Sequence, residues 1–330
     1  MTRKVLVTGG AGFIGSNIVA ELAAAGGFEI AVCDRLRAAD AGKWRNIAKH
    51  EIADFVAPDD CPAWLDGRGA DVDVVIHMGA ISSTMEADAD KIVHTNFGLS
   101  RDLFDWCRER QRRFIYASSA ATYGAGDRGF DDRSDIDYLK SLRPLNAYGW
   151  SKALFDLYVA RQGEAMPPQC AGLKFFNVYG PNEGHKGVMR SMVAQMWPAV
   201  AADQPVHLFK SYRDGYADGG QTRDFVSVRD AAAIVRWLVE TPHVSGLFNV
   251  GSGEARSFND LATAMFAAAG KPPHVAYIDM PEPIRDTYQY HTLAPMQRLR
   301  AAGYAAPLTM IDDGVGDYVR NYLSKADPYR

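Results

Sequence analysis

Short apolar runs alternate along the chain with stretches of helical periodicity, and glycines mark many of the boundaries between them. The first run, at 5–7, breaks into glycines and resumes with helical spacing up to Gly26, which predicts a strand, a tight turn and a helix. A βαβαβ order of this kind predicts an α/β fold with a doubly wound parallel sheet and ligand sites at the carboxyl ends of its strands. The later elements are predicted at 28–33, 72–77, 88–110 and 113–117.

The second half of the chain predicts a smaller C-terminal lobe beside this sheet. We place a dinucleotide-binding domain at 1–177, to which 224–250 returns, and a substrate lobe at 178–223 and 251–330. The pattern predicts helices at 188–200, 257–269 and 308–323, and strands at 206–209 and 246–250.

The composition fits a globular protein that binds a small molecule. With 330 residues, 47% of them hydrophobic, the chain can form one large domain with a smaller lobe. Its 36 Lys and Arg residues against 40 Asp and Glu give a net charge of -4, and no basic block favours a nucleic-acid partner. No apolar run reaches membrane-spanning length and none precedes the first strand, so we expect no membrane contact and a cytoplasmic location.

The cysteines point to neither a disulfide framework nor a metal site. They are scattered, without a C-x-x-C pair or a nearby set of histidines, and buried free thiols are the simpler interpretation. These residues are Cys33, Cys61, Cys107 and Cys170.

Three glycines in the first turn have the spacing of a dinucleotide-binding loop. Gly9, Gly12 and Gly15 follow one another at intervals of three, and 10–15 also fits G-x-G-x-x-G. Glycines at these places let the turn tighten, bring backbone close to a pyrophosphate and let helix pack on strand. Backbone N–H groups at the helix start then face the phosphates. Glycine-rich turns also join strands to helices for steric reasons alone, so the motif depends on its context.

An acidic residue ends the second predicted strand. Asp34 stands about 20 positions beyond the glycines, where a carboxylate accepts a hydrogen bond from the ribose 2′-hydroxyl, although a solvated turn Asp would give the same pattern. Arg35, Arg37 and Lys43 follow closely and could instead hold a 2′-phosphate. The residues alone therefore leave NAD against NADP open.

The strand predicted at 72–77 ends in residues that leave room for a cofactor. Met78, Gly79 and Ala80 follow it, and small residues there let a cofactor approach the edge of the sheet. We interpret His77, the last residue of this strand, as structural. Asp54, in a weaker segment further upstream, is a minor candidate for an adenine contact and could equally be a turn residue.

Ser119, Tyr148 and Lys152 carry the candidate chemistry. Tyr148 and Lys152 stand four positions apart where a helix is predicted to begin, so they share a face. We expect the ammonium of Lys152 to lower the pKa of the phenol, so that Tyr148 can act as a base. Ser119 would hydrogen-bond the same substrate hydroxyl. Each pattern alone is common in loops and on solvated helices, but their succession after the glycine turn favours the catalytic interpretation.

Taken together, these motifs resemble the extended short-chain dehydrogenase/reductase superfamily, the NAD-dependent epimerase/dehydratases, over nearly the whole chain. The resemblance is carried by 8–15, Asp34, 116–124 and 148–152. Within that superfamily, 174–187, which contains Gly-His-Lys-Gly, resembles the ADP-L-glycero-D-manno-heptose 6-epimerase family.

This resemblance implies an isomerase that inverts C6 of the heptose in a nucleotide sugar, ADP-heptose, for the lipopolysaccharide core. It implies tightly held NADP, with NAD as the alternative, and a transient oxidation at C6 before hydride returns to the other face. Tyr148 and Lys186 are then the acid/base pair, because two orientations of the carbonyl need two proton donors. Lys186 could instead be a charge that anchors the cofactor or the diphosphate, and His185 has a weaker claim. Similar epimerases form homo-oligomers, commonly pentamers.

Further contacts follow residue by residue from the same resemblance. Arg223 has a planar guanidinium that suits a diphosphate, or it could pair with Asp224 or Asp230. The implied cofactor contacts are Gly9, Gly12, Phe13, Ile14, Gly15, Asp34, Arg35, Lys43, Met78, Gly79, Ala80, Ser82, Asn96, Tyr148, Lys152, Val178 and Lys186. The implied substrate contacts are Ser119, Asn177, Val188, Gln195, Phe209, Lys210, Ser211, Tyr212, Arg223 and Tyr288.

The chain departs from similar epimerases at positions that bear on specificity. Met78 stands where many have an acidic residue, Val188 where they have a small polar one and Gln195 where they have His, and the loop before Arg223 is longer. The accepted nucleotide sugar could therefore differ, and another epimerase or reductase of the superfamily stays open. A dehydratase is disfavoured because alanines follow Ser119 where an acidic pair is usual. A non-catalytic dinucleotide sensor would have no need of a complete catalytic set.

Overall fold

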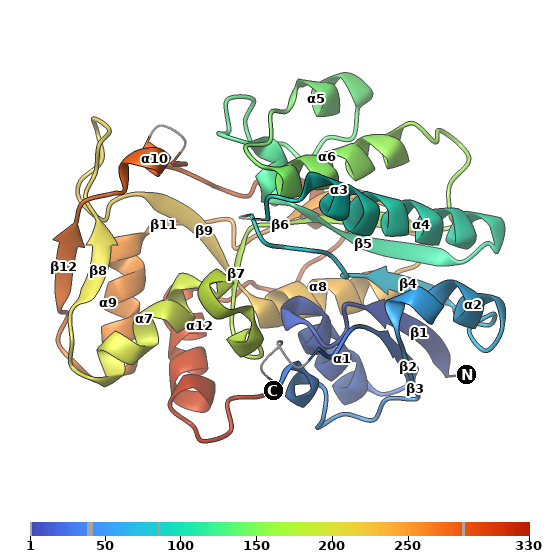
Figure 1. The fold of residues 1–330 in the computed structure, drawn as a ribbon, viewed down its shortest axis with the longest axis horizontal. Coiled ribbons are helices and arrows are strands. Elements are labelled where there is room, and N and C mark those ends of the chain that lie inside the picture. The colour runs from blue at the N-terminus through green and yellow to red at the C-terminus, as the bar shows by residue number, and fades with distance from the viewer. Residues whose placement is uncertain (1, 38–41, 85, 286–287) are drawn as a thin grey trace.

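The larger part of the protein is a seven-stranded parallel sheet with the strand order β10-β6-β5-β4-β1-β2-β3 (Figure 1). The computed structural model describes residues 2–37, 42–84, 86–285 and 288–330. Its doubly wound topology confirms the predicted fold class, and the order reverses between β1 and β4. The strands are β1 (Arg3–Thr8), β2 (Phe28–Cys33), β3 (Asp54–Val56), β4 (Val74–His77), β5 (Arg113–Ser119), β6 (Cys170–Phe175) and β10 (Gly246–Val250).

Helices cover both faces of this sheet, so its central strands can be apolar on both sides. α1 (Phe13–Ala25) and α8 (Val228–Glu240) lie together on one face, and α4 (Leu99–Glu109) and α6 (Ala147–Ala160) lie on the other (Figure 1). Shorter helices complete this lobe: α2 (Cys61–Asp66), α3 (Ala89–Ile92), α5 (Ile136–Ser141) and α11 (Gln297–Ala301).

The helix predicted over 88–110 is interrupted by a wide turn. α3 passes through a π-helical segment, Val93–Gly98, before α4 begins at Leu99. Asn96 lies in this segment and hydrogen-bonds the backbone of Ile81, its Oδ1 accepting from N at 2.8 Å and its Nδ2 donating to O at 3.0 Å. Through Asn96, the π-helical segment therefore fixes the loop after β4 to the helices that cover the sheet.

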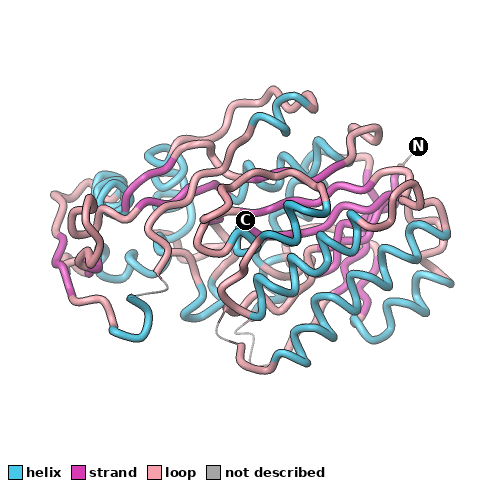
Figure 2. Tube along the Cα trace, turned by 90° about the horizontal axis from the view of Figure 1, so that it is seen from above, coloured by secondary structure: helices cyan, strands magenta, loops and turns pink. Residues whose placement is uncertain are grey.

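The smaller lobe has its own apolar core and two small sheets, which Figures 1 and 2 show at the end of the molecule away from β1–β3. β9 (Thr222–Ser227) pairs parallel to β7 (Asn177–Tyr179) and antiparallel to β11 (Ala255–Ser257). β8 (Val206–Phe209) pairs parallel to β12 (Val275–Ile278). The helices of this lobe are α7 (Met192–Ala201), α9 (Phe258–Ala268), α10 (Glu282–Arg285) and α12 (Ile311–Tyr318).

Two predicted helices begin later than expected. The helix expected at 188–200 starts at Met192, because Gly187 has a left-handed φ of 56° and Ser191 caps the helix by accepting from Ala194 N. The helix expected at 308–323 starts at Ile311, because the backbone N–H and hydroxyl of Thr309 are held by Asp230. It continues through a π-helical turn, Val319–Leu323.

Among the described residues, no helix combines the length and apolar character needed to cross a membrane. Within the same ranges, no group of three or more His, Cys, Asp and Glu side chains could hold a metal ion.

Candidate active site

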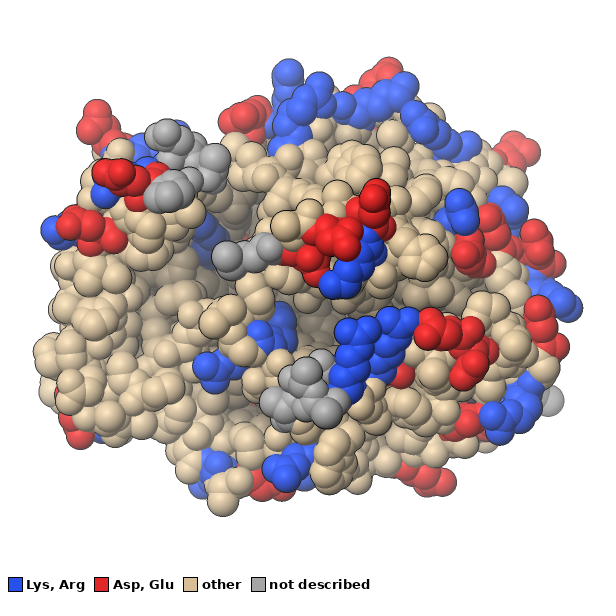
Figure 3. Space-filling model, in the orientation of Figure 1, with Lys and Arg blue, Asp and Glu red and all other residues tan. Residues whose placement is uncertain are grey.

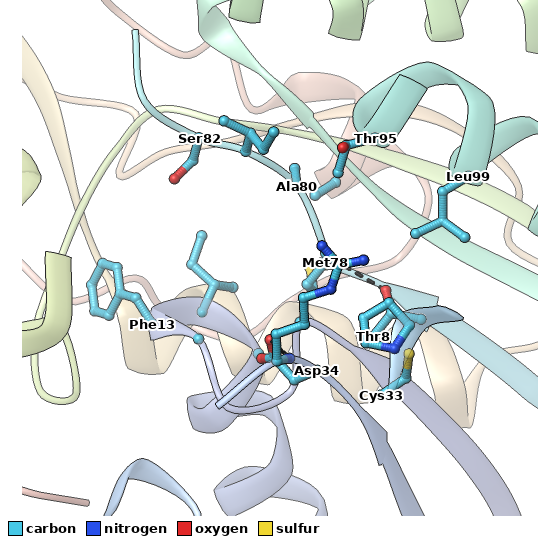
Figure 4. A pocket seen from close by; sticks show the side chains of 18 of the residues that line it. Thr8, Phe13, Cys33, Asp34, Met78, Ala80, Ser82, Thr95 and Leu99 are labelled. Atoms are coloured by element: carbon cyan, nitrogen blue, oxygen red, sulfur yellow. Dashed lines mark hydrogen bonds between the residues drawn. The ribbon is translucent and has the colours of Figure 1, made fainter. Parts of the chain in front are cut away.

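A cavity of about 720 Å³ opens where the strand order reverses, at the carboxyl ends of β1, β4 and β5. The space-filling view shows a hollow on this face with Lys and Arg side chains at its edge (Figure 3). Phe13, Asp34, Met78 and Ser82 surround the same space in the close view (Figure 4). A doubly wound fold places its ligand site at this point, because the loops separate where neighbouring strands connect in opposite directions.

The glycine turn brings backbone directly to the cavity wall. Gly9 has a left-handed φ of 65°, and its N–H donates to Cys33 O at 2.8 Å. A Cβ on Gly15 would lie 2.2 Å from Gly9 O, so only glycine lets α1 pack this close to the turn. Gly12 is the N-cap of α1, and among the described residues no side chain caps it. The first N–H groups of the helix are therefore available to an anion.

Asp34 closes the far end of the cavity and already accepts three hydrogen bonds. Its Oδ2 accepts from Ala11 N at 2.9 Å, and its Oδ1 accepts from Arg35 N at 2.7 Å and from Lys43 Nζ at 2.6 Å. Asp34 and Lys43 form an ion pair of which little is exposed. Arg35 instead pairs with the exposed Asp59.

A buried histidine joins the glycine turn to the helical layer, as the structural interpretation of His77 requires. Ser100 Oγ donates to Asn96 O, so it accepts from His77 Nε2 at 2.8 Å, and His77 Nδ1 accepts from the hydroxyl of Thr8 at 2.6 Å. The Thr8 oxygen in turn accepts from Gly79 N. Desolvation lowers the pKa of His77 to about 3, so the imidazole is neutral.

Ser119, Tyr148 and Lys152 meet at the neighbouring strand end. Ser119 is the last residue of β5, while Tyr148 and Lys152 lie one turn apart in α6, whose N-cap Asn146 accepts from Gly149 N at 2.8 Å. The Ser119 side chain lies close enough to the phenol of Tyr148 to lower its pKa. The nearly buried Lys152 donates from Nζ to Ala117 O at 2.8 Å.

The electrostatics of this group differ from the expectation for Tyr148. Desolvation raises the pKa of Tyr148, opposed by its hydrogen bond with Ser119, and Lys152 is not among the causes. Desolvation lowers the pKa of Lys152 from 10.5 to about 8, opposed by the charge of Asp156. The prediction that Lys152 lowers the phenol pKa is therefore wrong, because burial raises that pKa and Lys152 does not contribute to the shift.

Lys186 approaches the cavity from the smaller lobe. It lies in a 3₁₀ turn, Gly184–Met189, with its ammonium 5.3 Å from the centre of the Phe13 ring at the start of α1. Desolvation lowers its pKa, opposed by the negative charge of Glu183. Neighbouring His185 contacts Asn46 at 3.2 Å, and desolvation together with Lys43 and Lys186 lowers its pKa to about 4.

Most of the predicted cofactor and catalytic residues lie around this one cavity. Those that line it are Gly9, Gly12, Phe13, Ile14, Gly15, Asp34, Arg35, Lys43, Met78, Gly79, Ala80, Ser82, Ser119, Tyr148, Lys152, Val178 and Lys186. Asn96 is fully buried behind the wall, where it bonds Ile81 and Ser151. Asp54 also lies elsewhere, accepting from Trp64 Nε1 at 2.6 Å.

The predicted substrate residues other than Ser119 lie outside the lining of this cavity. Arg223 is nearly buried in β9, with its guanidinium 5.3 Å from the Tyr288 ring, and Tyr288 contacts Phe209 edge-on at 6.1 Å between ring centres. Within the described ranges, Arg223 pairs with no carboxylate, so the alternative of a salt bridge to Asp224 or Asp230 is wrong. Lys210 and Tyr212 both bond Asp279, and Ser211 N donates to Asp218.

Two other predicted substrate residues lie together near the 3₁₀ turn of Lys186. Gln195 Nε2 donates to Val188 O at 3.3 Å and to Arg190 O at 2.7 Å, and the Val188 side chain is 80% exposed. Asn177 is exposed at the start of β7.

The cavity also has lining residues that the sequence did not indicate. Thr95 and Leu99 come from the π-helical segment and the start of α4, and Phe175 and Phe176 come from the end of β6. Helical periodicity at 88–110 could not reveal Thr95, because the interruption that turns it toward the cavity has no periodic signal.

A glycine turn at the switch point, with Ser, Tyr and Lys at the neighbouring strand end, defines a dinucleotide-dependent enzyme of the short-chain dehydrogenase/reductase type. The chain belongs to the NAD dependent epimerase/dehydratase family, whose model matches residues 5–251.

The relatives narrow this class further. The chain is 47% identical to the ADP-L-glycero-D-manno-heptose-6-epimerase of Nitratidesulfovibrio vulgaris strain DP4, over 98% of this chain and 99% of that protein. It is similar to the crystal structure of the Helicobacter pylori enzyme of the same name, with a TM-score of 0.80, 28% identity and coverage of 97% and 96%. The UDP-glucose 4-epimerase of Thermus thermophilus, solved with NAD, has a TM-score of 0.69, 29% identity and coverage of 95% and 96%.

Proposed function

We propose that this protein is an ADP-heptose 6-epimerase that inverts C6 of ADP-D-glycero-D-manno-heptose to give ADP-L-glycero-D-manno-heptose. The observation that carries the proposal is that Tyr148 and Lys186, which reach the cavity from different lobes, line the same space as the glycine turn. Inversion requires a proton donor for each of two orientations of one carbonyl group, and Tyr148 and Lys186 would be these two donors. The names of relatives at 43–47% identity support the heptose substrate.

The residues present fit a dinucleotide. A Cβ on Gly9 would lie 2.7 Å from Gly79 N, so side chains are absent where a pyrophosphate would need to approach backbone. Gly12 and the uncapped start of α1 would hold the phosphates, and Asp34 with its neighbours would hold the adenosine ribose. Bound in this way, the cofactor would supply reversible hydride transfer at C6.

The chain's own residues would hold and move the proton at O6. Ser119 would donate a hydrogen bond to O6 and fix its position beside Tyr148. The phenolate of Tyr148 would take the hydroxyl proton, and Lys152 would stabilise that phenolate by its positive charge. After the 6-keto sugar has turned, Lys186 would give a proton to O6 on the other side. The lowered pKa of Lys186 suits this exchange, because its proton is released more easily than that of an exposed lysine.

We propose NADP as the cofactor because Lys43 pairs with Asp34. The ion pair offsets the carboxylate charge that would otherwise repel a 2′-phosphate, and Arg35 and Arg37 line the same end of the cavity. The test is mass spectrometry of the small molecules released when the purified protein is denatured. Recovery of NAD alone would refute this part of the proposal.

The activity is tested by proton NMR of ADP-D-glycero-D-manno-heptose incubated with purified protein and no added cofactor. We expect the signals of the C6 epimer to appear until the two sugars reach equilibrium. Lack of inversion at C6, with cofactor shown to be bound, would refute the epimerase and favour a dinucleotide sensor. If the protein inverts a different nucleotide sugar and not ADP-heptose, it is another epimerase of the same family.

We further propose that the protein forms a homo-oligomer, a pentamer as in similar epimerases. Light scattering during size-exclusion chromatography would give the mass, and a mass equal to the 36.2 kDa chain would refute it.

A further inference from the structure

A fully buried ion pair lies beneath the catalytic residues. Lys174 in β6 and Asp156 in α6 are joined at 2.7 Å between Nζ and Oδ2, and neither side chain is exposed to solvent. Replacing a buried ion pair by apolar residues is often neutral or stabilising, so such a pair is weak evidence of a stabilising role. Its position therefore calls for another explanation.

Asp156 connects the pair to the catalytic helix. It stands one turn beyond Lys152 in α6, and its charge is the influence that opposes desolvation at the Lys152 amine. Its carboxylate accepts from Tyr116 at 3.1 Å and from Ser118 at 2.7 Å, in addition to Lys174. These three donors fix the carboxylate in one place, so it presents a constant charge to Lys152.

Lys174 connects the pair to the turn that follows Ser119. Its ammonium donates to Thr122 Oγ1 at 2.6 Å, and the Thr122 hydroxyl donates to Ser119 O at 2.8 Å. The ammonium also lies 4.8 Å from the centre of the Tyr123 ring. The Lys174 ammonium therefore contacts the end of this turn, at Thr122 and Tyr123, and is linked through Thr122 to the backbone of Ser119.

The other titratable groups around this pair carry no charge near neutral pH. Desolvation lowers the pKa of His77 to about 3 and raises the pKa values of Tyr116, Tyr123 and Cys170. Desolvation also raises the pKa of Tyr148. Of the described groups that face Lys152 and Asp156, the charged ones are thus these two and Lys174.

We propose that Lys174 and Asp156 are positioning residues for catalysis: Asp156 supplies the fixed negative charge behind Lys152, and Lys174 holds the Ser119 turn through Thr122. The inference rests on the proposed roles of Ser119 and Lys152 in the epimerisation. It deepens that proposal by assigning the two catalytic elements, the end of β5 and the start of α6, a common buried support.

The test compares three variants of the protein with its cofactor bound. Asp156→Asn combined with Lys174→Met removes both charges, so that no unpaired charge is left buried. Thr122→Val keeps the ion pair and breaks the link to Ser119. Gln169→Met is the matched control, because Gln169 is equally buried just before β6 and donates to three backbone carbonyls on the far side of the sheet.

Two measurements separate the parts of the proposal. In the double variant we expect the pKa of Lys152 to fall by about one unit. This pKa is measured by NMR titration of ¹³Cε-labelled lysine, with the Lys152 signal assigned by comparison with Lys152→Met. In Thr122→Val we expect the pKa of Lys152 to be unchanged. We expect kcat for C6 inversion to fall about tenfold or more, with KM little changed. Gln169→Met should lower the melting temperature without either effect, and Lys174→Arg, which keeps both charges of the pair, should leave the Lys152 titration near that of the parent.

Several outcomes would overturn the inference. An unchanged Lys152 titration in the double variant would refute the role of Asp156, and an unchanged kcat in Thr122→Val would refute that of Lys174. If the double variant does not fold, Ser118→Ala, which removes one donor to Asp156, replaces it and should shift the same titration. If the parent does not invert ADP-heptose, the titration still tests Asp156, so the two proposals fail separately.

Discussion

At the scale of single residues, burial determines the protonation states in the cavity. It raises the pKa of Tyr148 and lowers those of Lys152 and Lys186, so each group is moved away from its charged form. Burial thus favours the neutral phenol of Tyr148, and the proposed phenolate would need a positive charge beside it, which Lys152 would supply.

Removing only the phenol oxygen tests this assignment. We expect Tyr148→Phe to abolish C6 inversion, because the proton acceptor is lost, while the protein still retains its dinucleotide. Turnover is followed by NMR and bound cofactor by mass after denaturation. Turnover equal to that of the parent would refute the role of Tyr148 as base.

His77 gives a stability prediction with a defined sign. Its pKa is about 3 in the folded protein against 6.5 when exposed, so between these values the unfolded chain binds a proton that the folded protein does not. The folded protein therefore loses about 1.4 kcal/mol per pH unit from this group as the pH falls from 6.5 toward 3. His77→Asn keeps a donor and an acceptor but does not titrate, so the stability difference from the parent should change with that slope.

Urea unfolding at a series of pH values measures this difference. His207→Asn, at an exposed position in β8, is the control for loss of a histidine. Parallel stability curves for the parent and His77→Asn between about pH 6.5 and 4 would contradict a neutral buried imidazole.

At the scale of elements, the close approach of α6 to the turn after β5 brings Tyr148 and Ser119 together. Gly149 makes the approach possible, since a Cβ there would lie 2.6 Å from Ala121 O. The same glycine donates its N–H to the N-cap Asn146, so one residue both starts the helix and lets it touch the turn.

A methyl group at this contact should separate Tyr148 from Ser119, the two residues proposed to act at O6. We expect Gly149→Ala to lower kcat by about tenfold to a hundredfold, since small displacements of catalytic groups have effects of this size. Gly67→Ala is the control, because a Cβ there makes only an ordinary contact of 3.4 Å and Gly67 is not among the residues that line the cavity. Unchanged kcat in Gly149→Ala would show that the helix can move without cost to catalysis.

At the scale of the whole molecule, we propose that the two lobes divide the binding of cofactor and substrate. The sheet lobe provides the glycine turn and the Ser, Tyr and Lys group, while the smaller lobe provides Lys186 and a separate aromatic cluster around Arg223. The Arg223 guanidinium lies over the rings of Phe258 and Tyr288, and desolvation lowers its pKa. It has no carboxylate partner among the described residues, and we propose that it binds the diphosphate of the nucleotide sugar.

Arg223→Ala tests this division. We expect KM for the nucleotide sugar to rise about tenfold or more, because a charge-assisted contact is lost, while bound cofactor is unchanged. Arg320→Ala, on an exposed turn after α12, is the matched control. Loss of cofactor in Arg223→Ala, or an unaltered KM, would contradict a substrate role for this lobe.

By itself, the sequence determined the features that depend on short-range geometry. The order of strands and helices, the glycine turn before α1 and the shared face of Tyr148 and Lys152 all follow from spacing along a few turns of chain. Helix starts were less well predicted where a long-range contact decides them, as Asp230 does for Thr309 before α12.

The tertiary structure alone decided which distant residues meet and how their charges behave. The approach of Lys186 to Phe13, the pairing of Lys174 with Asp156 and the stacking of Arg223 over Tyr288 join residues that are separated along the chain. The raised pKa of Tyr148 has the same origin, because desolvation depends on everything packed around a group and leaves no trace in local spacing.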